Sequence, residues 1–214
     1  RGSIMGFYLL FQIILEKGSN VIVGETNFQA ANEIIKNADG KIITVPVDKD
    51  GIDVDAVGEI CKKKKIRAIY IVSHHHHPTT VSLSAERRMK LLQLAEKHKF
   101  AIIEDDYDYD FHYESSPILP LTSSDRVGVV SYVGSFSKSI APAFRIGFVI
   151  APENLINEMA KFRRFVDRQG VVLLERSIAM MLEDSEIRRH MRKALKTYHH
   201  RRDFFCDLLQ KELG

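Results

Sequence analysis

The chain has 214 residues, of which 45% are hydrophobic and 28% are charged, as in ordinary globular proteins. Its net charge of +3 does not by itself indicate nucleic-acid or membrane binding, and no apolar run approaches the ~20 residues of a membrane span. The two cysteines, Cys61 and Cys206, are far apart, which predicts a cytoplasmic protein without a disulfide framework.

Segments with helical spacing alternate with short β-branched runs. In chain order, we predict a helix at 5–16, a strand at 20–23, a helix at 28–38, a strand at 41–47, a helix at 53–63, a strand at 68–72, a helix capped by Ser84 and running to 97, and strands at 100–103, 127–133 and 146–150. Helices dominate from about residue 153. The pattern predicts a three-layer α/β/α fold with a mostly parallel mixed sheet.

Ligands bind off the carboxyl ends of the strands in such sheets. Three segments should therefore meet at one rim: the loop after Val72, the residues 105–107 after Ile103, and the residues 135–138 after Val133. Both ends of the chain interrupt a helical pattern, so we expect it to be the middle of a larger polypeptide.

The rim carries groups suited to an aldehyde cofactor. Lys138 lies between two serines, and a lysine amine can form a Schiff base with an aldehyde. Asp105 could pair with a protonated ring nitrogen, although Asp106 is its neighbour and strand-end geometry alone does not choose between them. Tyr107 could donate a hydrogen bond to a ring oxygen.

A phosphate could be held by Ser135, Ser137 and Arg145 near this lysine. Gly2 and Ser3 open the first helix, and a helix N-terminus is a ready anion site. A lysine, a carboxylate for a pyridinium and a phosphate cradle together fit pyridoxal 5′-phosphate.

Several spaced motifs carry a family resemblance: Gly-Ser-Phe-Ser-Lys-Ser at 134–139, Glu-Asp-Asp-Tyr-Asp-Tyr-Asp-Phe at 104–111, 82–88 and 190–193. Over nearly its whole length the chain resembles the large domain of fold-type-I, class I/II aminotransferases. Within that superfamily it resembles the MocR subfamily of GntR-type transcriptional regulators, where a winged helix-turn-helix domain precedes an aminotransferase-like domain. The resemblance implies a large domain at 1–185, and an interdomain helix at 186–214 that leads to a small C-terminal domain outside the chain.

The resemblance also implies roles for single residues. Lys138 would be the Schiff-base lysine, Asp105 would pair with the pyridine nitrogen, and Tyr107 would bond the phenolic oxygen. The remaining cofactor contacts would be Phe28 stacked on the ring, His77 in the place of an asparagine, and a phosphate cradle of Gly2, Ser3, Ser135, Ser137 and Arg145. Two departures from the family pattern are Ile4, where relatives often carry glutamine, and His77 itself.

The four histidines at 74–77 raise the alternative of a metal site. Alternate side chains of an extended run point opposite ways, so one face offers only two of them, whereas structural zinc needs four ligands. A loop that lines the cofactor cleft is the favoured interpretation. The basic stretch 188–202 is interpreted as a solvated face of an amphipathic helix in preference to a DNA contact.

Three functions follow. The favoured one is an effector domain that senses pyridoxal phosphate or its adduct with a small amino compound, in a homodimeric regulator that contacts DNA only through a separate N-terminal domain. The second is a working aminotransferase in which Lys138 is the general base. The third is a metal-dependent binding module that uses the histidines. A winged helix-turn-helix before Arg1 would separate the first from the second.

Overall fold

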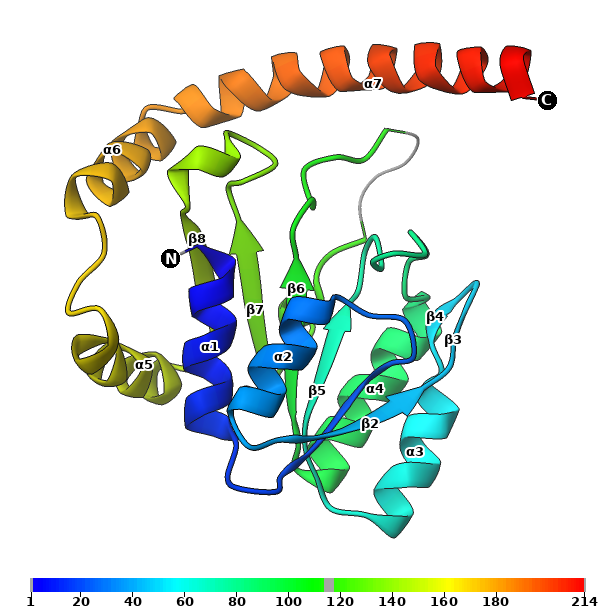
Figure 1. The fold of residues 1–214 in the computed structure, drawn as a ribbon, viewed down its shortest axis with the longest axis vertical. Coiled ribbons are helices and arrows are strands. Elements are labelled where there is room, and N and C mark those ends of the chain that lie inside the picture. The colour runs from blue at the N-terminus through cyan, green and yellow to red at the C-terminus, as the bar shows by residue number, and fades with distance from the viewer. Residues whose placement is uncertain (1, 114–117, 214) are drawn as a thin grey trace.

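A computed structural model describes residues 2–113 and 118–213, and it shows a central sheet between two layers of helices (Figure 1). The six strands lie in the order β2-β1-β5-β6-β7-β8. Their bounds are β1 Asn20–Gly24, β2 Lys41–Val45, β5 Ile66–Val72, β6 Ala101–Asp106, β7 Val130–Ser135 and β8 Gly147–Ile150. Only β8 runs antiparallel to its neighbour, β7. A small hairpin, β3 Val47–Asp48 and β4 Gly51–Ile52, stands apart. The predicted three-layer α/β/α fold is confirmed.

Two apolar cores lie on opposite faces of the sheet. Tyr70, Ile103 and Val133 belong to one core, which is covered by α1 Ser3–Ile14, α2 Gln29–Asn37 and α5 Glu153–Val166. Their sequence neighbours Ile69 and Ile102 belong to the other, which is covered by α3 Val54–Lys63 and α4 Ala85–His98. Because side chains alternate along a strand, neighbouring apolar residues of the central strands pack into opposite cores.

The end of β6 differs from the sequence prediction. The strand continues through Glu104, Asp105 and Asp106, which pair with β5 and β7, whereas its apolar pattern predicted an end at Ile103. All three acids are buried. The apolar pattern failed here because hydrogen-bonding side chains, rather than hydrophobic ones, fill the space around this end of the strand.

The helices after β8 lead from the β8 edge of the sheet to the carboxyl ends of its strands. They are α5, α6 Val172–Glu183 and α7 Glu186–Leu213, and α7 lies across the carboxyl ends of the strands (Figure 1). Short 3₁₀ turns occur at Leu121–Ser123 and Pro142–Phe144. A further domain after α7 stays a prediction, and Arg1 and Gly214, the outer bounds of the two predicted domains, lie outside the described residues. No described helix is long and apolar enough to cross a membrane.

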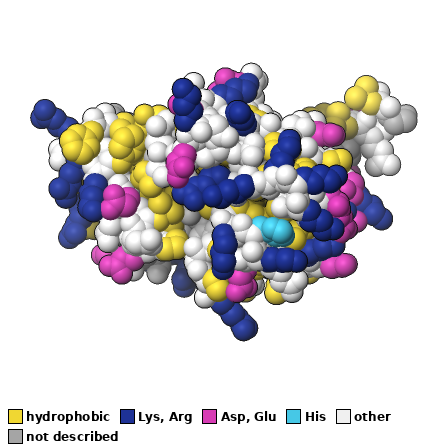
Figure 2. Space-filling model, turned by 90° about the horizontal axis from the view of Figure 1, so that it is seen from below, with side chains coloured by type: hydrophobic (Ala, Val, Ile, Leu, Met, Phe, Trp, Pro, Cys, Tyr) yellow, Lys and Arg dark blue, Asp and Glu magenta, His cyan; other side chains and the backbone are white. Residues whose placement is uncertain are grey.

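The opposite end of the molecule, below the sheet in Figure 1, shows Lys and Arg side chains scattered among acidic and uncharged ones (Figure 2). This mixture suits the small net charge. The chemistry-bearing residues lie instead at the carboxyl ends of the strands, beneath α7.

Candidate functional site

Lys138 and Tyr107 line one cavity at the carboxyl ends of the strands. The cavity has a volume of about 880 Å³, and the loop after β5 contributes His75 to its wall. Tyr198 and Arg202 on α7 line it as well. The Lys138 side chain is exposed, in the turn that follows β7. The predicted meeting of three segments at one rim is therefore present in the structure.

Asp105 is buried at the end of β6 and lies on the same side of the sheet as Tyr107, because its partner Tyr70 belongs to the core against which Tyr107 packs. The Tyr70 hydroxyl donates a hydrogen bond of 2.5 Å to its Oδ2. Burial raises the pKa of Asp105 to about 7, and the bond from Tyr70 opposes that rise. Asp106 faces the opposite side, so the alternation separates the two candidates for the ring nitrogen and places Asp105 beside Tyr107.

The Tyr107 hydroxyl donates a hydrogen bond of 2.8 Å to the backbone carbonyl of His75. Burial, and the nearby carboxylates of Asp108 and Asp105, raise the pKa of this tyrosine to about 12. The hydroxyl therefore keeps its proton at neutral pH and acts as a donor. This contact joins the end of β6 to the loop after β5 at the cavity wall.

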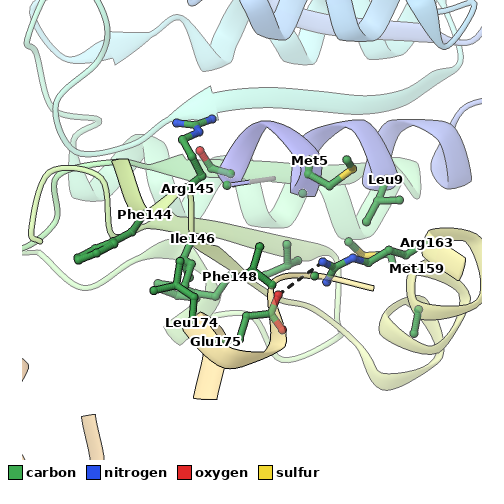
Figure 3. Close-up of a pocket in the computed structure, with 18 of the residues that line it drawn as sticks. Met5, Leu9, Phe144, Arg145, Ile146, Phe148, Met159, Arg163, Leu174 and Glu175 are labelled. Atoms are coloured by element: carbon green, nitrogen blue, oxygen red, sulfur yellow. Dashed lines mark ion pairs between the residues drawn. The ribbon is translucent and has the colours of Figure 1, made fainter. Parts of the chain in front are cut away.

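The N-terminus of α1 lies against Arg145. Gly2 has a φ of 71°, and a Cβ atom there would be 3.1 Å from Nη2 of Arg145. A Cβ on Gly147 would lie 2.6 Å from the backbone nitrogen of Ser3. Figure 3 shows Arg145, in the segment before β8, beside the N-terminal end of α1. A guanidinium and the free N–H groups of a first helical turn thus share one place, an arrangement that suits an anion.

Residues of this cradle also line a second cavity of about 440 Å³, bounded by α1, β8, α5 and α6 (Figure 3). Arg163 and Glu175 form an ion pair of 3.5 Å on its wall. Ser135 pairs with Gly147 across β7 and β8, and Gly147 lies against Ser3, so the end of β7 adjoins this cradle. The backbone nitrogen of Ser137 donates to Oγ of Ser135 at 3.1 Å, and Ser135 also lines a third cavity of about 560 Å³. The structure therefore groups Gly2, Ser3 and Arg145, and it places Ser135 and Ser137 together on the neighbouring end of β7.

Phe28 and His77 contact each other edge to face, with ring centroids 6.1 Å apart and planes at 87°. Phe28 precedes the first residue of α2, and His77 is exposed. The structure thus brings together two predicted cofactor contacts that are distant in sequence, one before α2 and one in the loop after β5. Their contacts with a cofactor ring stay predictions.

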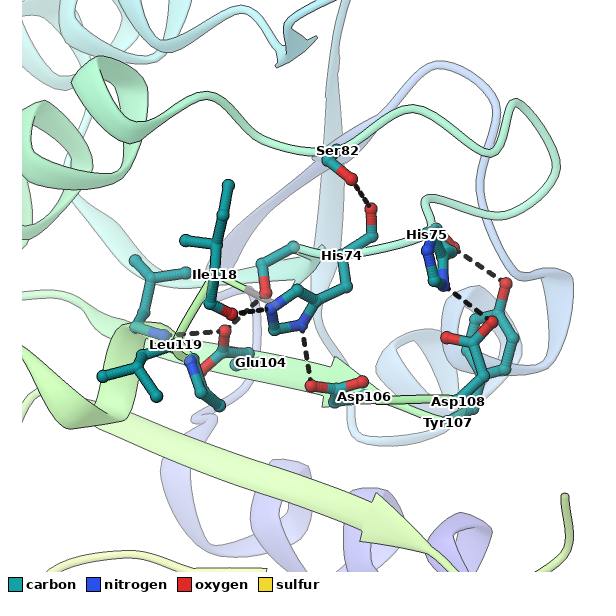
Figure 4. Close-up of polar contacts among 12 residues, drawn as sticks. His74, His75, Ser82, Glu104, Asp106, Tyr107, Asp108, Ile118 and Leu119 are labelled. Carbon is teal, nitrogen blue, oxygen red and sulfur yellow. Dashed lines mark hydrogen bonds and ion pairs between the residues drawn. The ribbon is translucent and has the colours of Figure 1, made fainter. Parts of the chain in front are cut away.

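The histidine run is used in four different ways. His74 bonds Asp106, and His75 bonds Asp108 at 2.9 Å (Figure 4). His76 bonds the Thr79 hydroxyl at 2.8 Å, and His77 contacts Phe28. Within residues 2–113 and 118–213, no three histidine, cysteine or acidic side chains form a group that could hold a metal ion.

The sequence did not reveal the buried polar residues that hold the acids of β6 and the neighbouring loops in place. Tyr70 holds Asp105, and Ser73 donates a 2.5 Å hydrogen bond to Glu104. The buried Arg88 on α4 donates to the carbonyl oxygens of Leu83, Leu119 and Ser73. The only signal for Tyr70 was a phenol in an otherwise aliphatic strand, and nothing in the pattern of α4 marked Arg88 as buried.

Comparison with known proteins gives consistent matches along the whole chain. The sequence model of the family "Aminotransferase class I and II" matches residues 1–214. An aromatic-amino-acid aminotransferase of Thermococcus litoralis is 27% identical over 98% of this chain and 52% of its own length. The probable rhizopine catabolism regulatory protein MocR of Rhizobium meliloti is 26% identical over 100% of this chain and 43% of its own.

The structure of a kynurenine aminotransferase of Pyrococcus horikoshii, in complex with PMP, superimposes with a TM-score of 0.93 at 27% identity. That comparison covers 100% of this chain and 54% of the other. The chain spans about half the length of the curated relatives it matches.

Proposed function

The chain belongs to the class I and II aminotransferase family, and from this premise we propose that it is the pyridoxal-phosphate-binding effector domain of a GntR/MocR-type transcriptional regulator. The observation that carries the cofactor assignment is the shared cavity of Lys138 and Tyr107, with Asp105 on the same face of the sheet. The regulator assignment is supported by the similarity to MocR over the whole chain and by the acidic motif at 104–111.

Pyridoxal 5′-phosphate is the cofactor of this family, and the residues present fit it. Arg145 and the first turn of α1 offer an anion cradle that a Cβ on Gly2 would crowd. Asp105 offers a buried carboxyl that accepts a hydrogen bond from the neutral phenol of Tyr70. When bound, the cofactor supplies an electron-withdrawing ring that stabilises negative charge at the carbon bearing the amino group.

In this proposal Lys138 would hold the cofactor aldehyde through Nζ, and Asp105 would bond the protonated ring nitrogen. Tyr107 would turn its one hydroxyl proton from the carbonyl of His75 toward the ring oxygen. Arg145 and Ser3 bind the phosphate. A small amino compound then enters the same cavity, next to His75. A sensor requires only that this compound bind two conformations of the protein with different affinity. The intact protein is proposed to be a cytoplasmic homodimer that contacts DNA through a separate N-terminal domain.

A working aminotransferase is the second candidate, and the similarity to the Thermococcus litoralis enzyme supports it. Lys138 Nζ would then also move a proton from the carbon bearing the amino group. The two candidates use the same residues. They differ in turnover: the enzyme converts many equivalents of a 2-oxo acid, whereas the sensor binds its amino compound without repeated amino transfer.

The assignment is tested on the full-length protein by visible absorbance after loading with pyridoxal phosphate. Lys138→Ala should lose the long-wavelength band and the covalent retention of cofactor through gel filtration. Lys161→Ala, an exposed lysine paired with Glu158 on α5, is the matched control and should keep both. A retained band in Lys138→Ala would overturn the role of this lysine. Coupled turnover with a panel of amino donors then separates the enzyme from the sensor.

A further inference from the structure

His75 pairs with an acid on the wall of the cavity that contains Lys138. It lies in the loop after β5, where its backbone carbonyl accepts the hydrogen bond of the Tyr107 hydroxyl. Its Nδ1 lies 2.9 Å from Oδ2 of Asp108, and both side chains line the cavity (Figure 4). They are 26% and 21% exposed, so the pair is reached by solvent although it is not on the open surface. The proposed function leaves this pair without a task.

The contact with Asp108 decides which ring nitrogen of His75 is the basic one. A carboxylate can only accept a hydrogen bond, so Nδ1 carries a proton. In the neutral imidazole the lone pair is then on Nε2. Nε2 has no hydrogen-bond partner within residues 2–113 and 118–213, and it is not one of the buried atoms that lack a partner. A neutral His75 thus offers a proton acceptor to the cavity.

The same contact makes the imidazole a stronger base. The hydrogen bond to Asp108 raises the pKa of His75 above its ordinary value, and burial opposes the rise. The charges of Asp108 and Asp106 add to it. An imidazole whose pKa lies close to neutral pH exists in both forms, which is the condition for taking a proton and returning it.

The charged and titratable groups that line this cavity or act on His75 come from three segments. They are Asp106, Tyr107, Asp108, His112 and Tyr113 at and after the end of β6, Lys138 after β7, and Tyr198 and Arg202 on α7. His112 is a second imidazole, with its ring centroid 5.1 Å from that of His75. Its Nε2 is buried and has no partner among the described residues, and burial lowers its pKa. His112 is therefore the weaker base and the one closed to a ligand.

An amino compound that enters this cavity needs a base. Aliphatic amines are ammonium ions at neutral pH, as the lysine side chain is. An ammonium nitrogen has no lone pair, so it attacks an aldehyde carbon only after it has lost a proton. In the proposed function Lys138 Nζ is occupied with holding that carbon. The proton therefore needs another acceptor on the cavity wall.

We propose that His75 is a catalytic residue whose Nε2 takes the proton from the ammonium group of the incoming amino compound, and that Asp108 is a positioning residue that fixes its ring. The inference rests on the proposed function for the cofactor aldehyde. One N–H bond of the ammonium breaks, one forms at Nε2, and the electron pair stays on the amine nitrogen. That pair forms the bond to the carbon, the bond to Nζ breaks, and Lys138 leaves as a neutral amine. His75 then returns the proton to solvent.

Benzylamine is a suitable probe because part of the cavity wall is aromatic. Phe111 and Tyr198 contact each other edge to face, with centroids 5.4 Å apart, and both line the cavity. The test mixes benzylamine with the full-length protein loaded with pyridoxal phosphate and follows the rate of the absorbance change. His75→Gln should lower this rate about 100-fold at neutral pH, because it removes a general base.

Methoxyamine is the matched amine, because its nitrogen is largely unprotonated at neutral pH and needs no base. It should react with His75→Gln at the wild-type rate. His112→Gln is the matched variant, and it should keep the wild-type rate with both amines. If His75→Gln slows methoxyamine as much as benzylamine, the defect is one of packing and the inference is overturned.

The pH profile tests the role of Asp108. In the wild type, the rate with benzylamine should rise with pH through the pKa of His75, because only the neutral imidazole accepts a proton. Asp108→Asn removes the charge that raises this pKa, so the midpoint should move to lower pH by about one unit. An unchanged midpoint would refute the role of Asp108 as the group that sets the basicity of His75.

A further measurement needs no cofactor. Side-chain ¹H–¹⁵N spectra of the cofactor-free protein should show neutral His75 with its proton on Nδ1 and none on Nε2. A proton on Nε2 of the neutral ring would overturn the inference. A wild type that retains no cofactor refutes the proposed function, whereas a loaded His75→Gln protein that reacts with benzylamine at the wild-type rate refutes this inference alone.

Discussion

Replacing Tyr70 by phenylalanine removes one hydrogen bond from the site and little else. The hydroxyl donates 2.5 Å to Oδ2 of Asp105, and both residues are buried. The ring packs edge to face on Phe7, with centroids 5.6 Å apart, and phenylalanine keeps that packing. The variant therefore isolates the effect of the phenol on the charge of Asp105.

The magnitude follows from the pKa of Asp105. Burial raises it to about 7 although the Tyr70 bond lowers it. A hydrogen bond to a charged group contributes about 1.5–3 kcal/mol, and one pKa unit corresponds to about 1.4 kcal/mol. Loss of the bond should therefore raise the pKa of Asp105 by a further ~1–2 units. Asp105 would change from mostly ionised to mostly protonated at slightly alkaline pH.

Two measurements follow from this shift. The affinity for pyridoxal phosphate, measured at a pH of about 7.5, should fall about 10-fold and recover in more alkaline buffer. In the cofactor-free protein, the folded-state pKa lies above the unfolded one, so the stability that Asp105 contributes is present at low pH and lost as the pH rises through the folded value. Tyr70→Phe should therefore destabilise the protein more at alkaline pH than at about pH 5.

The matched control is Tyr8→Phe, which removes a phenol on α1 whose ring stacks on Phe162, 6.3 Å away. It should leave the pH profile of cofactor binding unchanged. A Tyr70→Phe protein that binds the cofactor with the wild-type pH dependence would refute the link between this phenol, the charge of Asp105 and the ring nitrogen. Equal losses of affinity at all pH values would also refute it, because they would indicate a packing defect.

Three further predictions concern other parts of the structure. Gly147→Ala places a Cβ 2.6 Å from the backbone nitrogen of Ser3, so it should lower the free energy of unfolding by about 1–3 kcal/mol in urea and weaken phosphate binding. Gly58→Ala, whose Cβ would meet nothing closer than 3.7 Å, should stabilise α3 by up to about 1 kcal/mol, and equal effects of the two variants would contradict this. The cofactor-free wild type should lose about 4 kcal/mol of stability between about pH 4 and pH 7 as Asp105 ionises, and Asp105→Asn should not show this loss. If the stability of Asp105→Asn falls with pH as steeply as that of the wild type, Asp105 is not the titrating group. Asp53→Ala removes an N-cap that accepts from the backbone nitrogens of Asp55 and Ala56, and it should cost about 1 kcal/mol by thermal melting without altering cofactor affinity.

The sequence by itself determined the fold class and the edge of the sheet, at the carboxyl ends of the strands, where the site lies. Short β-branched strands alternate with amphipathic helices, and this local periodicity depends only on which residues are apolar. It therefore located the strands that lead to Asp105 and Lys138 within a few residues. The motifs around those strands were sufficient to indicate the family and its cofactor.

Only the tertiary structure decided which polar groups meet. Tyr70 reaches Asp105 across 35 positions of sequence, and His74 reaches Ile118 across 44. A pattern of single residues holds no information on such pairs, because strand order and register bring them together. The same register placed Asp105 and Asp106 on opposite faces, with a phenol beside one and an imidazole beside the other. Two adjacent carboxyl groups that are equivalent in the sequence thereby acquired different hydrogen-bond partners.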